Sequence, residues 1–149
     1  MSVVNMQKTI KEVHNDYVCL YKVGAFYHAY EKDAILMSYL FGYYIKTVQN
    51  NISMIGFPKD SINKVMSKLE NKKINYVLID VKNNYDEDEK IDNGNLNTYN
   101  DIFEKAHKYI KIKRRIDKIC ENLTYEIEKE NIKDKLRRIE EIIDESWKI

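Results

Sequence analysis

Apolar residues in the first half of the chain recur at helical spacing in some segments and form short continuous runs in others. Residues 5–14 carry apolar side chains at helical spacing, which predicts a short helix. The run 17–23 is apolar, aromatic and β-branched, as is typical of a buried strand. After Gly24, residues 25–30 predict a second strand that returns beside the first.

The same alternation of patterns continues to residue 81. The further predicted elements are a helix capped by Asp33, strands over 43–48 and 52–57, a helix capped by Asp60 or Ser61, and a central strand over 74–81. Strands and helices in this order predict an α/β fold, in which a mixed β-sheet is flanked by helices. We expect this domain to occupy residues 1–85.

The pattern changes after residue 85. Residues 86–92 contain five acids and one lysine, so we expect 86–96 to be an acidic linker. From 97 to 149 there is no strand pattern and no proline, and two amphipathic stretches predict a C-terminal helical hairpin. The apolar stripes of these helices need to be buried against each other, against the α/β domain or against a second chain.

The cysteine content and the hydropathy of the chain indicate which cofactors and which cellular location to expect. Cys19 and Cys120 are the only cysteines, and no Cys/His cluster has metal-ligand spacing, so neither a metal nor another cofactor is expected. Two isolated thiols in a lysine-rich chain fit a reducing cytoplasm. No apolar run approaches the roughly 18 residues of a membrane span, and the N-terminus lacks the apolar stretch of a secretion signal. We therefore expect a cytoplasmic protein with no membrane partner.

Motifs typical of enzymes are missing from the sequence. The four glycines are scattered, so no phosphate-binding loop of the G-x-x-x-x-G-K-[ST] type is present and no ATPase activity is expected. None of the three histidines has a Ser, Cys or paired carboxylate at a spacing that suggests a catalytic triad. We therefore expect no catalytic residues and a protein that is not an enzyme.

Two segments of the chain resemble a known family. The segment "YVCLYKVGAFYHAYEKDA", residues 17–34, resembles the start of domain I, the mismatch-recognition domain of the DNA mismatch repair protein MutS. The segment "GFPKDSINKVMSKLENKKINYVLID", residues 56–80, resembles that family's Gly-Ile-Pro turn, the helix after it and its last strand. The positions that agree are His14, Tyr21, Gly24, Phe26, Tyr27, Asp33, Ala34, Ser38, Gly56, Pro58, Lys68, Leu69 and Asn71. The likeness covers about residues 5–81 and implies the same α/β fold, followed by an unrelated helical tail.

The resemblance implies a role for Phe26. In the family, the phenylalanine of a Phe-x-Glu motif wedges beside a mispaired base, and the glutamate bonds to that base. Phe26 matches the wedge residue, but His28 stands where the glutamate is expected, so the family's mismatch discrimination does not carry over directly. Strand alternation points Tyr27 to the opposite face from Phe26, and we expect Tyr27 to be packed. The alternative is that Phe26 is an ordinary core aromatic and His28 a surface residue without a role.

A basic stretch lies in the first predicted C-terminal helix. Residues 105–118 carry seven positive charges against Asp117 alone, although the net charge of the whole chain is only +1. The residues that we expect to contact phosphates are Lys108, Lys111, Arg114, Arg115 and Lys118. The alternative is a solvated helix face whose charge is balanced by the acids between residues 140 and 145.

Two functions remain open from the sequence. The first is a non-catalytic nucleic-acid-binding module that recognises distorted or structured nucleic acid, with DNA favoured over RNA, through Phe26, His28 and the basic stretch. The second is a protein-interaction adaptor that reuses the same scaffold, in which the C-terminal helices form a homo-oligomer or dock a partner enzyme.

Overall fold

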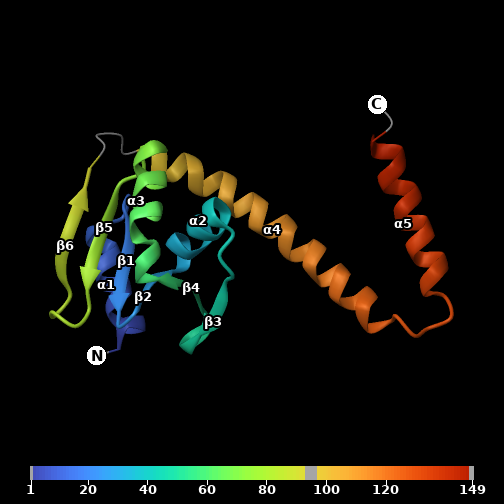
Figure 1. Cartoon of the computed structure of the whole chain (residues 1–149), viewed down its shortest axis with the longest axis horizontal. Coiled ribbons are helices and arrows are strands. Elements are labelled where there is room, and N and C mark those ends of the chain that lie inside the picture. Colours follow the sequence, from blue (N-terminus) through green and yellow to red (C-terminus); the bar gives the residue numbers. More distant parts are fainter. Residues whose placement is uncertain (1, 93–96, 148–149) are drawn as a thin grey trace. The chain divides into compact units, whose positions relative to one another are not determined.

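The computed structural model describes residues 2–92 and 97–147 of the chain. By their internal contacts the residues form two compact units, residues 1–110 and residues 111–149. The first unit contains a β-sheet with helices packed on it, and the second is helical (Figure 1). The mixed α/β fold predicted from the sequence is confirmed.

A six-stranded sheet forms the centre of the first unit. Its spatial order is β3-β4-β2-β1-β5-β6. Only the β1–β5 pair is parallel, while the other four pairs are antiparallel, so the sheet is mixed. The strands are β1 (Val18–Val23), β2 (Phe26–Tyr30), β3 (Lys46–Val48), β4 (Ile52–Pro58), β5 (Tyr76–Asp80) and β6 (Asp86–Ile91).

Helices cover both faces of the sheet. Apolar residues of α1 pack against one face, together with Cys19 and Tyr21 of β1. Residues of α2, α3 and the start of α4 pack against the other face, together with Val18 and Leu20 of the same strand. Successive side chains of a strand point to opposite faces, so the buried part of β1, residues 18–21, carries no charged side chain, and Lys22 follows where burial becomes partial. The helices are α1 (Val3–Val13), α2 (Glu31–Phe41), α3 (Ile62–Asn71), α4 (Asn97–Tyr125) and α5 (Ile132–Trp147).

The acidic segment differs from its prediction. Instead of a linker, Asp86–Ile91 forms the edge strand β6, paired antiparallel with β5. An edge strand needs backbone pairing but no apolar alternation, and charged side chains protect its outer edge from pairing with other chains. A close contact of 2.5 Å between His14 Nε2 and a Glu87 carboxylate oxygen also holds the strand. The Tyr17 hydroxyl donates a 2.7 Å hydrogen bond to Asp92, at the end of the strand. Residues 93–96 of the predicted linker lie outside the described residues.

The predicted helix caps agree with the structure only in part. Helix α2 already begins at Glu31, and the Asp33 carboxylate is buried among other elements instead of capping the helix. A short 3-10 turn over Lys59–Ser61 precedes α3. Ser61 is the N-cap residue of α3, as one of the two predicted alternatives had it, but it makes no side-chain hydrogen bond to the helix. The strand predicted over 43–48 is shorter in the structure, since β3 begins at Lys46.

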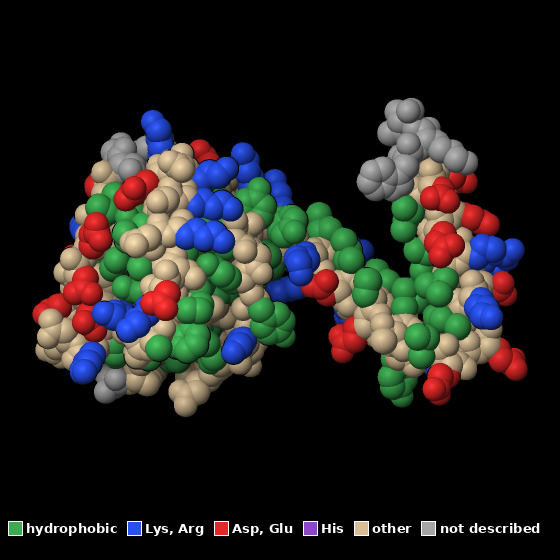
Figure 2. Space-filling view, viewed as in Figure 1, with side chains coloured by type: hydrophobic (Ala, Val, Ile, Leu, Met, Phe, Trp, Pro, Cys, Tyr) green, Lys and Arg blue, Asp and Glu red, His purple; other side chains and the backbone are tan. Residues whose placement is uncertain are grey.

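Helix α4 belongs to both units. Its first part is packed in the α/β unit, where Tyr99, Ala106 and Ile110 are buried. The boundary between the units therefore falls inside α4 and not before it, which differs from the predicted division at residue 97. In the second unit, many apolar side chains of the helices remain uncovered (Figure 2).

Candidate nucleic-acid interface

A tight hairpin at the rim of the sheet presents Phe26. Val23 pairs with Phe26 across β1 and β2, so Gly24 and Ala25 alone form the turn. Gly24 has φ +62°, which hairpin turns of two residues require and glycine adopts without strain. The Lys59 backbone N–H donates a 2.9 Å hydrogen bond to the Ala25 carbonyl, which ties the turn to the end of β4. The backbone that carries Phe26 is therefore held from both sides.

The two neighbouring aromatic residues of β2 have different environments. The Phe26 side chain points away from the main core, and the residue is 49% exposed. Tyr27 is only 6% exposed and stacks on Phe57 with ring centroids 5.6 Å apart. The prediction that Tyr27 is packed and Phe26 faces outward is confirmed, and Phe26 is not an ordinary core aromatic.

His28 lies on the same side of β2 as Phe26. Its ring covers Gly56 of β4 so closely that a Cβ at Gly56 would lie 3.2 Å from it. His28 Nδ1 lies 3.3 Å from the Tyr30 hydroxyl, so a ligand would meet the ring through Nε2. Burial lowers the pKa of His28 below its ordinary value, and the nearby Lys46 lowers it further. The ring is therefore neutral at neutral pH and offers one hydrogen-bond donor and one acceptor.

The pairing of strands brings further residues close to Phe26 and His28 that the sequence analysis did not identify. In β4, Pro58 pairs with Phe26 and Gly56 pairs with His28. Phe26, Gly56 and Pro58 are exposed, whereas His28 is partly buried. Lys46 in β3 and Lys59 after β4 add two exposed positive charges close to these residues. Their proximity depends on the pairing of β2 with β4, about 30 residues apart in sequence. Only the family resemblance at Gly56 and Pro58 indicated that this segment is relevant.

The basic residues predicted to contact phosphates are exposed along α4. The structure places Lys108 in the first unit, on the part of α4 that packs against the face of the sheet opposite to Phe26. It therefore does not bring Lys108 together with Phe26 and His28. The other predicted basic residues belong to the second unit; they are Lys111, Arg114, Arg115 and Lys118. Among the residues that the structure describes, none of these five side chains forms an ion pair.

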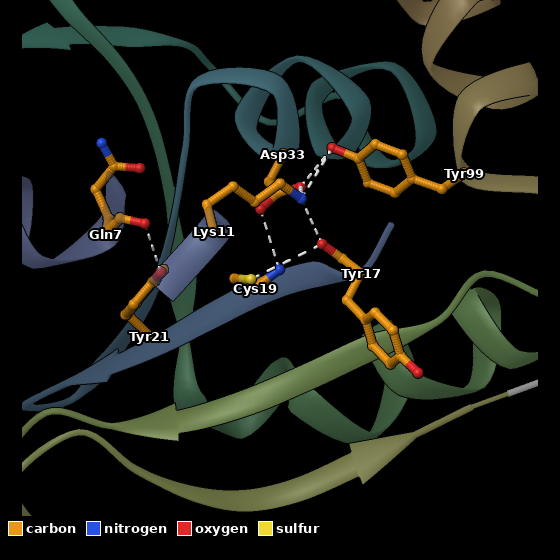
Figure 3. A network of polar contacts seen from close by, with 7 residues as sticks. All are labelled: Gln7, Lys11, Tyr17, Cys19, Tyr21, Asp33 and Tyr99. Atoms are coloured by element: carbon orange, nitrogen blue, oxygen red, sulfur yellow. Dashed lines mark hydrogen bonds and ion pairs between the residues drawn. The ribbon is translucent and has the colours of Figure 1, made fainter. Parts of the chain in front are cut away.

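A network of buried polar groups lies at the other end of β1 (Figure 3). The Asp33 carboxylate accepts hydrogen bonds from Lys11 Nζ at 2.8 Å, from the Tyr99 hydroxyl at 2.6 Å and from the Cys19 backbone N–H at 3.1 Å. Lys11 also donates to the Tyr17 carbonyl at 2.5 Å. The network thereby joins α1, β1, α2 and α4.

This network of polar groups has a structural role. Burial raises the pKa of the Cys19 thiol, and the neighbouring Asp33 carboxylate raises it further, so the thiol is protonated and a poor nucleophile. Burial also raises the pKa of the Tyr99 hydroxyl, which Asp33 reinforces. These hydrogen bonds join neighbouring elements, and Lys11, whose side chain is partly exposed, also lines a surface pocket together with Gln7. We assign the network to fixing the start of α4 on the α/β unit.

The structure gives two further observations on binding. Within residues 2–92 and 97–147, no group of three His, Cys, Asp or Glu side chains is arranged to hold a metal ion. None of the helices in this part of the chain is both long enough and apolar enough to cross a membrane.

The fold and the rim of its sheet together define a class of protein: a small mixed α/β domain that presents an aromatic side chain outward on a fixed hairpin. The family model for MutS domain I matches residues 2–125, and the chain belongs to this family. The match extends beyond the resemblance at residues 5–81 and includes α4, so the part of the C-terminal segment outside it begins at residue 126. Domain I of MutS is a recognition domain without a catalytic role. A comparison with curated proteins found no match.

Proposed function

We propose that this protein is a non-catalytic nucleic-acid-binding module that recognises distorted or structured DNA in preference to RNA and has no ATPase activity. The observation that carries the proposal is the half-exposed Phe26 ring on a hairpin tied down at both strands. An apolar ring on a rigid support is suited to insert beside a base step or to stack on an unpaired base. Membership of the MutS domain I family supports the same role.

The residues around Phe26 supply complementary contacts. His28 is neutral, and its Nε2 can donate to or accept from the edge of a base. Lys46 and Lys59 carry positive charges that can contact the phosphates on either side of that base. The ring thus gives sequence-independent stacking, and the lysines give attraction to the backbone.

The basic residues of α4 supply a second phosphate contact in this proposal. Lys111, Arg115 and Lys118 recur at helical spacing and lie on one face of the helix. Such a row can follow the sugar-phosphate backbone without reading bases. It increases affinity for any nucleic acid, whereas Phe26 provides the preference for a distorted one.

Binding is expected to weaken steeply with salt. Each phosphate contact releases counterions, so three to five contacts should lower the affinity for duplex DNA roughly 40- to 500-fold between 50 and 200 mM salt. Fluorescence anisotropy on paired, mismatched, bulged and single-stranded DNA and on structured RNA measures this dependence. The absence of salt-sensitive binding to all of these ligands would exclude the proposed function.

Replacing His28 by glutamate is expected to increase the preference for mismatched over paired duplex. A carboxylate at this position accepts a hydrogen bond from a base, and charge-assisted hydrogen bonds contribute about 1.5–3 kcal/mol. The ratio of the two dissociation constants should therefore rise roughly 10-fold or more. His28→Gln, which is uncharged, serves as the control and should leave the ratio near that of the wild type. An unchanged ratio in His28→Glu would show that position 28 does not contact the base.

A further inference from the structure

The helices of the second unit carry apolar stripes that the chain itself does not bury. In α4, Ile112, Ile116 and Ile119 are all more than half exposed. In α5, Leu136 and Ile143 are also exposed, and Ile142 lies beside them. The spacing of three and four residues along α4 is that of a coiled-coil seam, in which each apolar side chain packs between residues of a partner helix. These stripes are therefore suited to a helical partner.

The charges on the two helices are complementary. Between residues 111 and 118, α4 carries five positive charges and Asp117 alone as an acid. Between residues 140 and 145, α5 carries four acids and no basic residue. Two α4 segments side by side would place like charges together, whereas α4 against an antiparallel α5 sets basic residues opposite acidic ones.

The connection between the helices is built from specific contacts. Glu126 forms ion pairs with Lys135 at 2.6 Å and with Lys129 at 3.7 Å. Backbone hydrogen bonds between residues three or four apart recur from Asn122 to Lys135, and Ile132 is buried at the start of α5. With this connection formed, the apolar stripes of α4 and α5 remain exposed, so the α5 of the same chain does not cover α4.

We propose that the stripes are covered by a second copy of this chain. The segment 111–125 of α4 from one copy packs antiparallel against α5 of the other, and the reciprocal pair forms by two-fold symmetry. The four helices bury the isoleucine stripes in a common core, as in a four-helix bundle. The basic part of each α4 lies beside the acidic part of the partner's α5. This inference concerns the C-terminal unit and uses neither Phe26 nor His28. It sets against acids the same basic face of α4 to which the proposed function assigns phosphate contacts, so the partner's α5 and nucleic acid compete for that face.

Light scattering coupled to size-exclusion chromatography tests this arrangement on the full chain without nucleic acid. The wild type should have about twice the monomer mass of 17.9 kDa. Replacing Ile116 by glutamate should raise the dissociation constant of the dimer at least 100-fold. Val13→Glu, at a valine that is exposed on α1 outside the C-terminal unit, is the matched control and should remain dimeric. A wild type that is monomeric at all concentrations would overturn the inference.

Two charge-reversed variants test whether α4 packs against α5 of a second copy or against α5 of its own chain. The first carries Lys111→Glu with Arg115→Glu, and the second carries Glu141→Lys with Asp144→Lys; all four sites are exposed on helices. Each variant alone sets like charges across both helix pairs and should be monomeric. An equal mixture restores opposite charges at both pairs and should return to the dimer mass. Two variants that keep their helical circular dichroism but stay monomeric when mixed would contradict the proposed arrangement.

Discussion

Replacing Phe26 by alanine is expected to weaken binding to a duplex with a single-base bulge about 5- to 150-fold. Stacking of a base on an aromatic side chain contributes about 1–3 kcal/mol, and each 1.4 kcal/mol is a factor of ten in affinity. The same substitution should change binding to a fully paired duplex much less, because a paired base offers no open face to the ring. Fluorescence anisotropy with both duplexes at constant salt gives the two dissociation constants.

The matched control for this variant is Tyr44→Ala. Tyr44 is a strongly exposed aromatic residue of the same unit, in the segment before β3. Its removal should leave both dissociation constants within about twofold of the wild type. Since Phe26 is half buried, its replacement should lower the free energy of unfolding by about 1–2 kcal/mol, so both dissociation constants are measured where circular dichroism shows the variant to be folded. Equal losses in the two variants, or no loss in Phe26→Ala, would show that Phe26 has no specific role.

Replacing Asp33 by alanine is expected to destabilise the protein by about 3–5 kcal/mol. The carboxylate is 2% exposed and accepts hydrogen bonds from Lys11, Tyr99 and the Cys19 backbone N–H. Its loss leaves a largely buried positive charge and two buried donors without their acceptor. Removing one partner of a buried ion pair is strongly destabilising because the remaining charge is not compensated. The free energy of unfolding from urea titration, followed by circular dichroism, measures the effect.

Two further variants show how much of the destabilisation comes from one hydrogen bond of the network and how much any lost carboxylate would cause. Tyr99→Phe removes only the hydroxyl, which donates to Asp33 and accepts a longer hydrogen bond of 3.3 Å from Lys11, and should lower the free energy of unfolding by about 1 kcal/mol. Asp60→Ala removes an exposed carboxylate before α3 and should change it by less than about 0.5 kcal/mol. A loss in Asp33→Ala as small as that in Asp60→Ala would contradict the structural role of the network.

The core of the α/β unit could be predicted from the sequence because apolar periodicity reports burial directly. The alternation in β2 correctly separated Phe26 from Tyr27, since neighbouring strand residues face opposite sides. The run at β5 was recognised as a central strand because a strand covered on both faces is apolar throughout. In these places local pattern and tertiary environment agree.

The elements that were missed depend on contacts between distant residues. Strand β6 consists almost entirely of charged residues, and only its backbone pairing with β5 makes it a strand. Asp33 has the sequence position of a helix cap, but contacts with residues 14 and 66 positions away place its carboxylate in the buried network. Likewise, Lys46 and Lys59 join the candidate interface through strand order, which single-sequence patterns do not determine.

Photo-crosslinking from position 26 tests the central claim most directly. The photoreactive analogue p-benzoylphenylalanine is incorporated in place of Phe26, and in a second protein in place of Tyr44, and each is irradiated with a bulged duplex. We predict a crosslink from position 26 that maps to the bulged base or its immediate neighbours, and none from position 44. A protein that binds the duplex but forms no crosslink from position 26 would contradict the claim that this ring contacts the distorted base.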